Sequence, residues 1–263
     1  NEAFAAAGFE NAIEARQMPD NADWDASDVR YNVVRRSDSL SMWALGFGPS
    51  RVNPLTGEIL DADVILDANV VRLLRLQYQS QGLDALPEAE FYMQLCGQRS
   101  QAWYLQCAAL QRGGEAGLEQ AQAMMGPPPS ERLTDDQCAG YLGGQQHAFG
   151  ALALATLSGA DFSSEQLDTY IQQYLVALTA HEIGHTLGLR HNFAGSRLLS
   201  PSDLNDPTIT QTQGLVSSVM DYFPPNIAPA GTPQGDYFPT RLGPYDLWAI
   251  EYGYRQAPPS PLR

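Results

Sequence analysis

The sequence contains no lysine, so arginine supplies all 15 of its basic side chains. They stand against 30 acidic residues, which gives a formal net charge of -15 at pH 7. A chain with this charge repels nucleic-acid phosphates and anionic lipid headgroups, because both are negatively charged. We therefore expect no nucleic-acid partner and no attachment to an anionic membrane surface.

Long hydrophobic runs are also missing. No stretch approaches the roughly 20 apolar residues that a membrane-spanning helix requires, and no basic start followed by an apolar segment marks a signal peptide. The chain opens at Asn1 without an initiator methionine, and its end at residues 257–261 is rich in proline. These ends are typical of a processed or excised domain, so we expect the chain to be part of a longer polypeptide.

Cysteine is scarce. The chain has only Cys96, Cys107 and Cys138, and an odd number leaves at least one of them outside any disulfide. Either one disulfide with one buried thiol or three buried thiols would fit this number. The cysteines therefore do not show whether the protein occupies an oxidising compartment. Their spacing matches no zinc motif.

The remaining composition is that of a folded protein. Apolar residues make up 44% and charged residues 17% of the 263 residues, without low-complexity tracts. This length suffices for one large domain or two closely packed subdomains with a sizeable core.

Extended segments are expected in the first part of the chain, after a short helix at residues 1–7 that Gly8 closes. There, β-branched and aromatic residues lie between turn residues, a pattern that predicts strands. The expected strands are residues 12–16, 31–35, 41–46 and 58–66. The turn-rich segment 49–57 predicts an antiparallel hairpin with a long loop between the last two.

Helical spacing dominates the rest of the chain. Apolar positions indicate helix over residues 68–125, before a Gly-Pro-Pro-Pro break and a Gly-rich stretch at 140–150. A further helix begins near Ser163, where Gln166 three residues on forms a capping-box pattern. Its apolar residues recur at helical spacing, so we expect a buried helix that runs into His181.

The motif that carries chemistry is His-Glu-Ile-Gly-His-Thr-Leu-Gly-Leu-Arg-His at residues 181–191. Residues four apart lie on one face of a helix, so His181 and His185 can direct two imidazoles at one point. Gly188 can adopt the left-handed conformation that ends a helix, which returns His191 as a third ligand. Three neutral nitrogens with one open position predict a zinc site, with Glu182 beside it as general base and not as ligand.

Chance can place two histidines and a glutamate in a buried helix. The longer pattern is far more demanding, because the glycine and the third histidine both stand at the required spacing. The fourth histidine, His147, lies in the Gly-rich stretch, where we expect a surface or hydrogen-bonded residue.

With this motif the sequence resembles the metzincin metallopeptidases, which follow the three histidines with a methionine turn. Met220 stands in Ser-Ser-Val-Met-Asp-Tyr at 217–222 and matches the methionine that packs under the metal ligands. Tyr222 matches a tyrosine that approaches the metal in the astacin-like and serralysin-like branches. A methionine of the ordinary core and a buried structural tyrosine are the alternatives.

Within this clan the chain is most similar to the large bacterial zinc-dependent metalloproteases with a Met-zincin domain. The similarity rests on segments 30–33, 53–60, 191–193 and 246–250, and residues 243–254 look like the C-terminal helix of metzincins. Asn192 departs from the better-known branches, so no substrate preference carries over. Residues 83–150 have no counterpart, and we expect a helical insertion there.

The resemblance implies an α+β metzincin-like fold with a twisted mixed β-sheet and the active-site helix in residues 1–191. A smaller irregular subdomain, 192–263, would carry the Met-turn and the C-terminal helix, with the cleft between the two. The implied activity is a zinc-dependent endopeptidase with one catalytic Zn²⁺ and a polypeptide substrate, secreted or periplasmic. We expect the substrate to pair with a sheet edge formed by residues 58–66. A zinc hydrolase of small amides or glycopeptides and a non-catalytic binding module are the alternatives.

Overall fold

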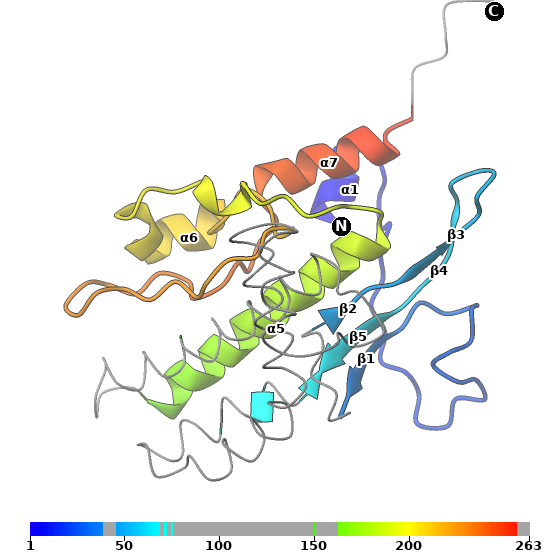
Figure 1. Ribbon diagram of the computed structural model, residues 1–263, viewed down its shortest axis with the longest axis horizontal. Coiled ribbons are helices and arrows are strands. Elements are labelled where there is room, and N and C mark those ends of the chain that lie inside the picture. Colours follow the sequence, from blue (N-terminus) through cyan, green and yellow to red (C-terminus); the bar gives the residue numbers. More distant parts are fainter. Residues whose placement is uncertain (39–45, 69–70, 73–74, 76–149, 151–162, 257–263) are drawn as a thin grey trace, which may run out of the picture.

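The computed structural model describes residues 1–38, 46–68, 71–72, 75, 150 and 163–256 (Figure 1). Within these residues the chain is a mixed α+β protein, as predicted. The strands are β1 Val34–Ser37, β2 Gly46–Phe47, β3 Ser50–Val52, β4 Ile59–Ala62 and β5 Val64–Asp67. The α-helices are α1 Glu2–Ala6, α5 Ser164–Thr186, α6 Pro207–Gln213 and α7 Pro244–Tyr254, and the 3₁₀ turns are η3 Gly195–Arg197 and η4 Asp203–Asn205.

The strands form two small sheets. β5 lies between β1 and β2, parallel to β1 and antiparallel to β2, so the predicted mixed sheet is confirmed. The antiparallel pairing of β2 with β5, with Gly46 opposite Leu66, confirms the pairing expected between the strand that ends at 46 and residues 58–66. β3 and β4 form a separate antiparallel hairpin, and β3 lies within residues 49–57, which were expected to be a loop. Both β2 and β5 pack against α5, which runs beside the sheet in Figure 1.

Asp63 divides the strand that was predicted over 58–66. Its backbone N–H donates to the carbonyl of Pro49 at 3.2 Å, and its carboxylate accepts from the N–H of Val33 at 3.0 Å. The chain therefore changes partners at this residue, with β4 paired to β3 before it and β5 paired to β1 and β2 after it. The prediction of one continuous strand was wrong, because periodicity does not show where a strand changes sheets.

Two other strand predictions fail in part or completely. Residues 12–16 form no strand, because Ile13 exchanges both of its backbone hydrogen bonds with the side chain of Asn1 (2.7 and 2.9 Å). The strand expected at 31–35 starts only at Val34, since Tyr31 stacks on Trp24 with ring centroids 3.9 Å apart. Side-chain contacts have replaced the strand pairing at both places.

Helix α5 begins where its capping residues predict. The Ser163 hydroxyl accepts from the N–H of Gln166 at 3.2 Å, and the Gln166 side chain accepts from the N–H of Ser163 at 2.8 Å. This reciprocal pair satisfies two backbone donors that a helix start otherwise leaves unpaired. The predicted helix into His181 is confirmed and continues to Thr186.

Two apolar clusters surround α5 and the ends of the chain. One packs a face of α5 against the segment near α6, with Leu167, Tyr170, Ile171, Tyr174, Ala177, Tyr237 and Phe238 as its buried members. The Gln173 side chain adds hydrogen bonds from the N–H of Tyr237 (2.6 Å) and to Asp236 (2.8 Å). The other cluster packs α1 on α7 through Ala3, Phe4, Ala7 and Ile250.

Several predictions fall outside the described residues. These are the helical stretch over 76–125, the insertion at 83–150 apart from Gly150, the residues 41–45 of an expected strand, His147 and the three cysteines. They stay predictions.

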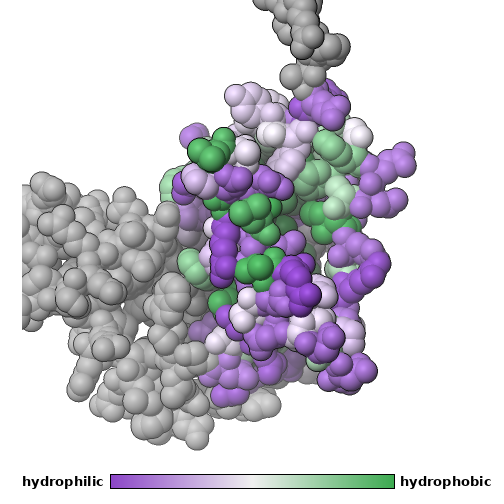
Figure 2. All heavy atoms as spheres, turned by 90° about the vertical axis from the view of Figure 1, so that its right-hand side faces the viewer, coloured by the Kyte–Doolittle hydropathy of each residue, from purple (hydrophilic) through white to green (hydrophobic). Residues whose placement is uncertain are grey.

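None of the helices in the described part of the chain combines the length and apolar character of a transmembrane segment. Figure 2 shows the face that lies to the right in Figure 1, where hydrophilic residues predominate and apolar ones form separate patches.

The capping box predicts a measurable contribution to stability. Ser163→Ala removes the side-chain acceptor at the start of α5 and should lower the free energy of unfolding by about 1 kcal/mol. Ser164→Ala is the matched control, because Ser164 is exposed and follows the cap. Denaturant unfolding of both variants measures the difference, and equal stability of the two would refute this role for Ser163.

Candidate metal centre

Two histidines lie one turn apart on the last part of α5. His181 is buried, with 6% of its surface exposed, while His185 is half-buried nearer the helix end. Their ring centroids are 4.8 Å apart. The helix thus presents both imidazoles to the same side, as the four-residue spacing predicts.

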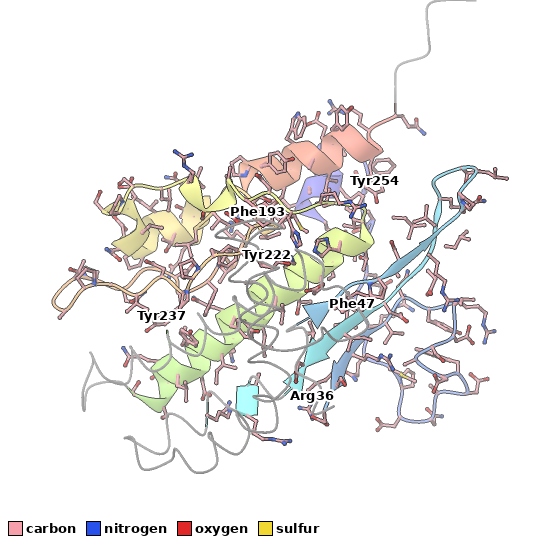
Figure 3. The ribbon with its side chains drawn as sticks, in the orientation of Figure 1. Arg36, Phe47, Phe193, Tyr222, Tyr237 and Tyr254 are labelled. Atoms are coloured by element: carbon pink, nitrogen blue, oxygen red, sulfur yellow. The ribbon has the colours of Figure 1, made fainter. Side chains whose placement is uncertain are left out.

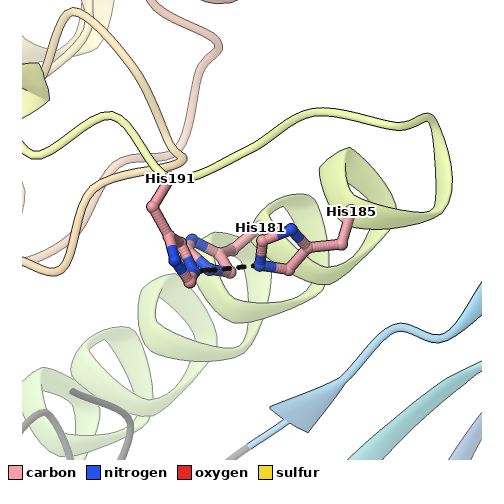
Figure 4. A group of neighbouring side chains, drawn as sticks. All are labelled: His181, His185 and His191. Carbon is pink, nitrogen blue, oxygen red and sulfur yellow. Dashed lines mark hydrogen bonds between the residues drawn. The ribbon is translucent and has the colours of Figure 1, made fainter. Parts of the chain in front are cut away.

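The chain reverses direction directly after α5. The N–H of Leu189 donates to the carbonyl of Gly184 at 3.0 Å and that of Gly188 to the carbonyl of His185 at 2.9 Å. This pair of bonds is the Schellman motif, which needs a left-handed residue, and Gly188 has a φ of 85°. The reversal brings His191 back over the helix, as Figure 4 shows.

The three histidines converge through their Nε2 atoms. The Nε2 of His191 lies 3.0 Å from that of His185 and 3.2 Å from that of His181. Nitrogens bound tetrahedrally to zinc at its usual bond length are about 3.3 Å apart, so the spacing fits that ion. Lone pairs that face each other at this distance repel unless a cation lies among them. The cluster is thus suited to a metal ion.

Hydrogen bonds to carbonyl groups fix which nitrogen of each helical histidine can bind a metal. The Nδ1 of His181 lies 2.7 Å from the Val219 carbonyl oxygen, and that of His185 lies 3.0 Å from the Leu189 carbonyl oxygen. A carbonyl only accepts, so both Nδ1 atoms carry protons and both Nε2 atoms keep lone pairs for the metal. Burial lowers the pKa of His181 to about 3, which keeps the ring neutral, and the hydrogen bond to Val219 opposes this shift.

Glu182 lies beside the histidines, on the side of α5 that faces the sheet. It is 6% exposed, and the backbone N–H of Gly48 donates a hydrogen bond to its carboxylate. Burial raises the pKa of Glu182 to about 7, while the hydrogen bond from Gly48 acts in the opposite direction. A carboxylate in this environment holds a proton far more readily than an exposed one.

Met220 lies on the opposite flank of the helix. It is fully buried, and its sulfur lies so close to Gly184 that a side chain on Gly184 would collide with it. Gly184 comes between His181 and His185 in the sequence, so the methionine supports the helix next to both ligands.

The loop that follows His191 is fixed to the segment around Met220. The N–H of Asn192 donates to the Met220 carbonyl at 2.9 Å, and that of Ser217 donates to the Gly195 carbonyl at 2.7 Å. Ser196 adds a hydrogen bond from its N–H to Asp221 at 2.8 Å. The third histidine is therefore held by the 217–221 turn, which also orients His181 through Val219.

Asp246 of α7 holds that turn in place. Its side chain is 1% exposed and accepts from the Ser218 hydroxyl at 2.6 Å, the Val219 N–H at 2.9 Å and the Gly243 N–H at 2.9 Å. A buried carboxylate needs several donors to offset its lost hydration, and Asp246 has three.

Two aromatic residues complete the described surroundings (Figure 3). The Tyr222 ring centroid is 4.5 Å from that of His191 and 5.3 Å from that of His181. Phe193 is 66% exposed and lies 6.0 Å from Tyr222, ring to ring. The structure thus gathers the predicted ligands, Glu182, Met220 and Tyr222 around one point.

The model of the Met-zincin family matches residues 163–262, from the cap of α5 through α7. Over these residues the chain is similar to the Met-zincin family. The match confirms the resemblance to the metzincins, and with the three-histidine cluster it is consistent with a metzincin-like zinc metallopeptidase. Searches of the curated proteins and of the solved structures found no match.

Sequence reasoning missed three contributors to this site. Gly46 in β2 and Gly48 directly after it approach Glu182, and Asp246 reaches the turn from α7. The Gly-Phe-Gly sequence at 46–48 was an available signal, because glycine within a strand often marks a close backbone approach. The contact of Asp246 with a turn far from it in the sequence had no local signal.

The ligand assignment can be tested by metal analysis. Changing His181, His185 or His191 to alanine should each weaken zinc binding at least about 10-fold, because one of three ligands is lost. His147→Ala is the control and should bind zinc like the parent protein. Equal zinc loss in the His147 variant would show that the ligand set is wrong.

Proposed function

We propose that this chain is a zinc-dependent endopeptidase that hydrolyses peptide bonds of polypeptides. The observation that supports it most is the convergence of three Nε2 atoms, with the buried Glu182 next to two of the ligands. His181, His185 and His191 would hold one zinc ion, which would supply a Lewis acid to polarise a carbonyl and lower the pKa of a water.

Glu182 acts in this proposal as the general base. Its carboxylate takes a proton from the attacking water, whose oxygen forms the new bond to the scissile carbon. The same carboxyl then delivers this proton to the leaving amine nitrogen as the C–N bond breaks. A pKa raised by burial suits both steps, since the group must accept and then release a proton.

The order of the strands guides the choice of a substrate-aligning edge. Of the residues 58–66 that the sequence suggested, those in β5 lie in the centre of the three-stranded sheet, and those in β4 belong to the separate hairpin with β3. Among the described strands, β1 and β2 are the two edges of the three-stranded sheet, and β2 is the edge that packs on α5 next to Glu182. We therefore assign the pairing with an extended substrate to β2.

Two residues of the 217–222 segment, Met220 and Tyr222, have separate roles in this proposal. Met220 belongs to the Met-turn that supports the ligand-bearing helix, and Tyr222 donates a hydrogen bond to the oxyanion of the tetrahedral state. The ring contacts of Tyr222 with His181 and His191 support this position.

We further propose subdomains at 1–191 and 192–263, and a secreted or periplasmic location.

Release of peptides from an unfolded protein would distinguish this function from hydrolysis of small amides or glycopeptides. Sensitivity of that release to a chelator, with recovery on addition of zinc, would establish the metal dependence. Turnover of small amides without any release of peptides would contradict the proposal.

Removal of the base should separate chemistry from metal binding. Glu182→Ala should lower kcat at least about 10²-fold while zinc stays bound, because Glu182 is not a ligand. Glu165→Ala, which changes an exposed glutamate on the same helix, is the control and should keep full activity. Near-normal turnover by zinc-loaded Glu182→Ala would refute the mechanism.

Loss of the tyrosine hydroxyl tests the second catalytic assignment. Tyr222→Phe should lower kcat on the order of 10²-fold, with bound zinc and melting temperature preserved, since one oxyanion donor is lost. Tyr252→Phe on the exposed face of α7 is the matched control. An unchanged kcat with a lowered melting temperature would make Tyr222 a structural residue.

A further inference from the structure

Two glycines face the active-site helix: Gly46 in the edge strand β2, and Gly48 directly after this strand. Gly46 and Gly48 flank Phe47, whose side chain is 45% exposed and lies on β2 in Figure 3. Because side chains alternate along an extended chain, the two glycines share the face that α5 covers. Neither has a positive φ, so conformational freedom is not the reason for glycine at these positions.

The two positions differ in what a side chain would meet. A Cβ on Gly48 would lie 2.5 Å from the backbone oxygen of Glu182 and 3.2 Å from its carbonyl carbon. These atoms belong to the interior of α5 and cannot yield without disturbing the helix. A Cβ on Gly46 would come within 2.5 Å of Oε1 and 2.8 Å of Cγ of Glu182, which belong to a flexible side chain.

Gly48 also contacts the reactive end of Glu182. Its backbone N–H donates to the carboxylate, and Glu182 is buried, so this bond forms away from bulk water. Hydrogen bonds from an N–H to a carboxylate are about twice as strong as neutral ones. Because Gly48 has no side chain, it can lie directly against the backbone of Glu182. At the same time its N–H reaches the carboxylate of Glu182.

We propose that Gly48 is the positioning residue of Glu182: its missing side chain seats β2 on α5, and its N–H orients the carboxylate toward the metal centre. This inference rests on the proposed function, in which Glu182 is the base. It makes the edge strand a part of the catalytic geometry and not only a template for substrate.

The hydrogen bond can be tested without any activity measurement. In the zinc-loaded chain labelled with ¹⁵N-glycine, the Gly48 amide should exchange slowly with solvent, and Glu182→Gln should shift its resonance and speed its exchange. The Gly253 amide is the internal control, because Gly253 lies on α7 and a Cβ there would meet nothing within 4 Å. A Gly48 resonance and exchange rate unchanged by Glu182→Gln would overturn the proposal.

Kinetics of the glycine variants provide the second test. Gly48→Ala should lower kcat at least about 10-fold with bound zinc unchanged, whereas Gly253→Ala, which meets nothing within 4 Å, should match the parent. In the Glu182→Gln background, Gly48→Ala should cause no further loss, because residues that act through one another are not additive. Equal loss in both backgrounds would mean that Gly48 acts independently of Glu182 and would overturn the proposal.

The two proposals fail in different ways. If the parent chain releases no peptides while the Gly48 amide still responds to Glu182→Gln, the endopeptidase proposal fails and the contact between Gly48 and Glu182 stands. If the parent is an active peptidase and the amide does not respond, only the positioning role is lost.

Discussion

The rotation of an α-helix by about 100° per residue is the constraint on which the site depends. It puts His181 and His185 on one face of α5 and turns Glu182 and Gly184 by about 80° to opposite flanks of that face. The sheet reaches the first flank through β2, and the 217–221 turn reaches the second through Met220. The geometry of one helix therefore separates Glu182, the two histidines and the contact with Met220.

The flank with Met220 is supported by a buried carboxylate that lies far away in the sequence. Asp246 accepts from the Val219 N–H, and the Val219 carbonyl in turn accepts from His181. The same turn holds the backbone of Asn192 beside His191. The orientation of two ligands thus depends on a carboxylate of α7 that contacts neither imidazole. The hydroxyl of Tyr254 adds a further link, as it donates to the carbonyl of Leu187 at the end of α5.

The features that the sequence predicted correctly are formed by residues close together in the chain. The capping box at Ser163, the left-handed Gly188 and the histidine spacing each depend on residues within one or two helical turns, and the structure reproduces these features. What it could not predict depends on contacts between distant segments. The partner change at Asp63 arises from Pro49 and Val33. The approach of Gly48 to Glu182 likewise joins a strand end to a helix more than a hundred residues later.

The contact between α7 and the 217–221 turn also determines when the site can exist. During synthesis the three histidines leave the ribosome before Asp246, so until α7 has folded the Val219 N–H lacks its hydrogen bond to the Asp246 carboxylate. A nascent chain would therefore have its histidines before the hydrogen bonds that orient His181 are complete. The arrangement of the cluster depends on the last described helix, although that helix supplies none of its three histidines.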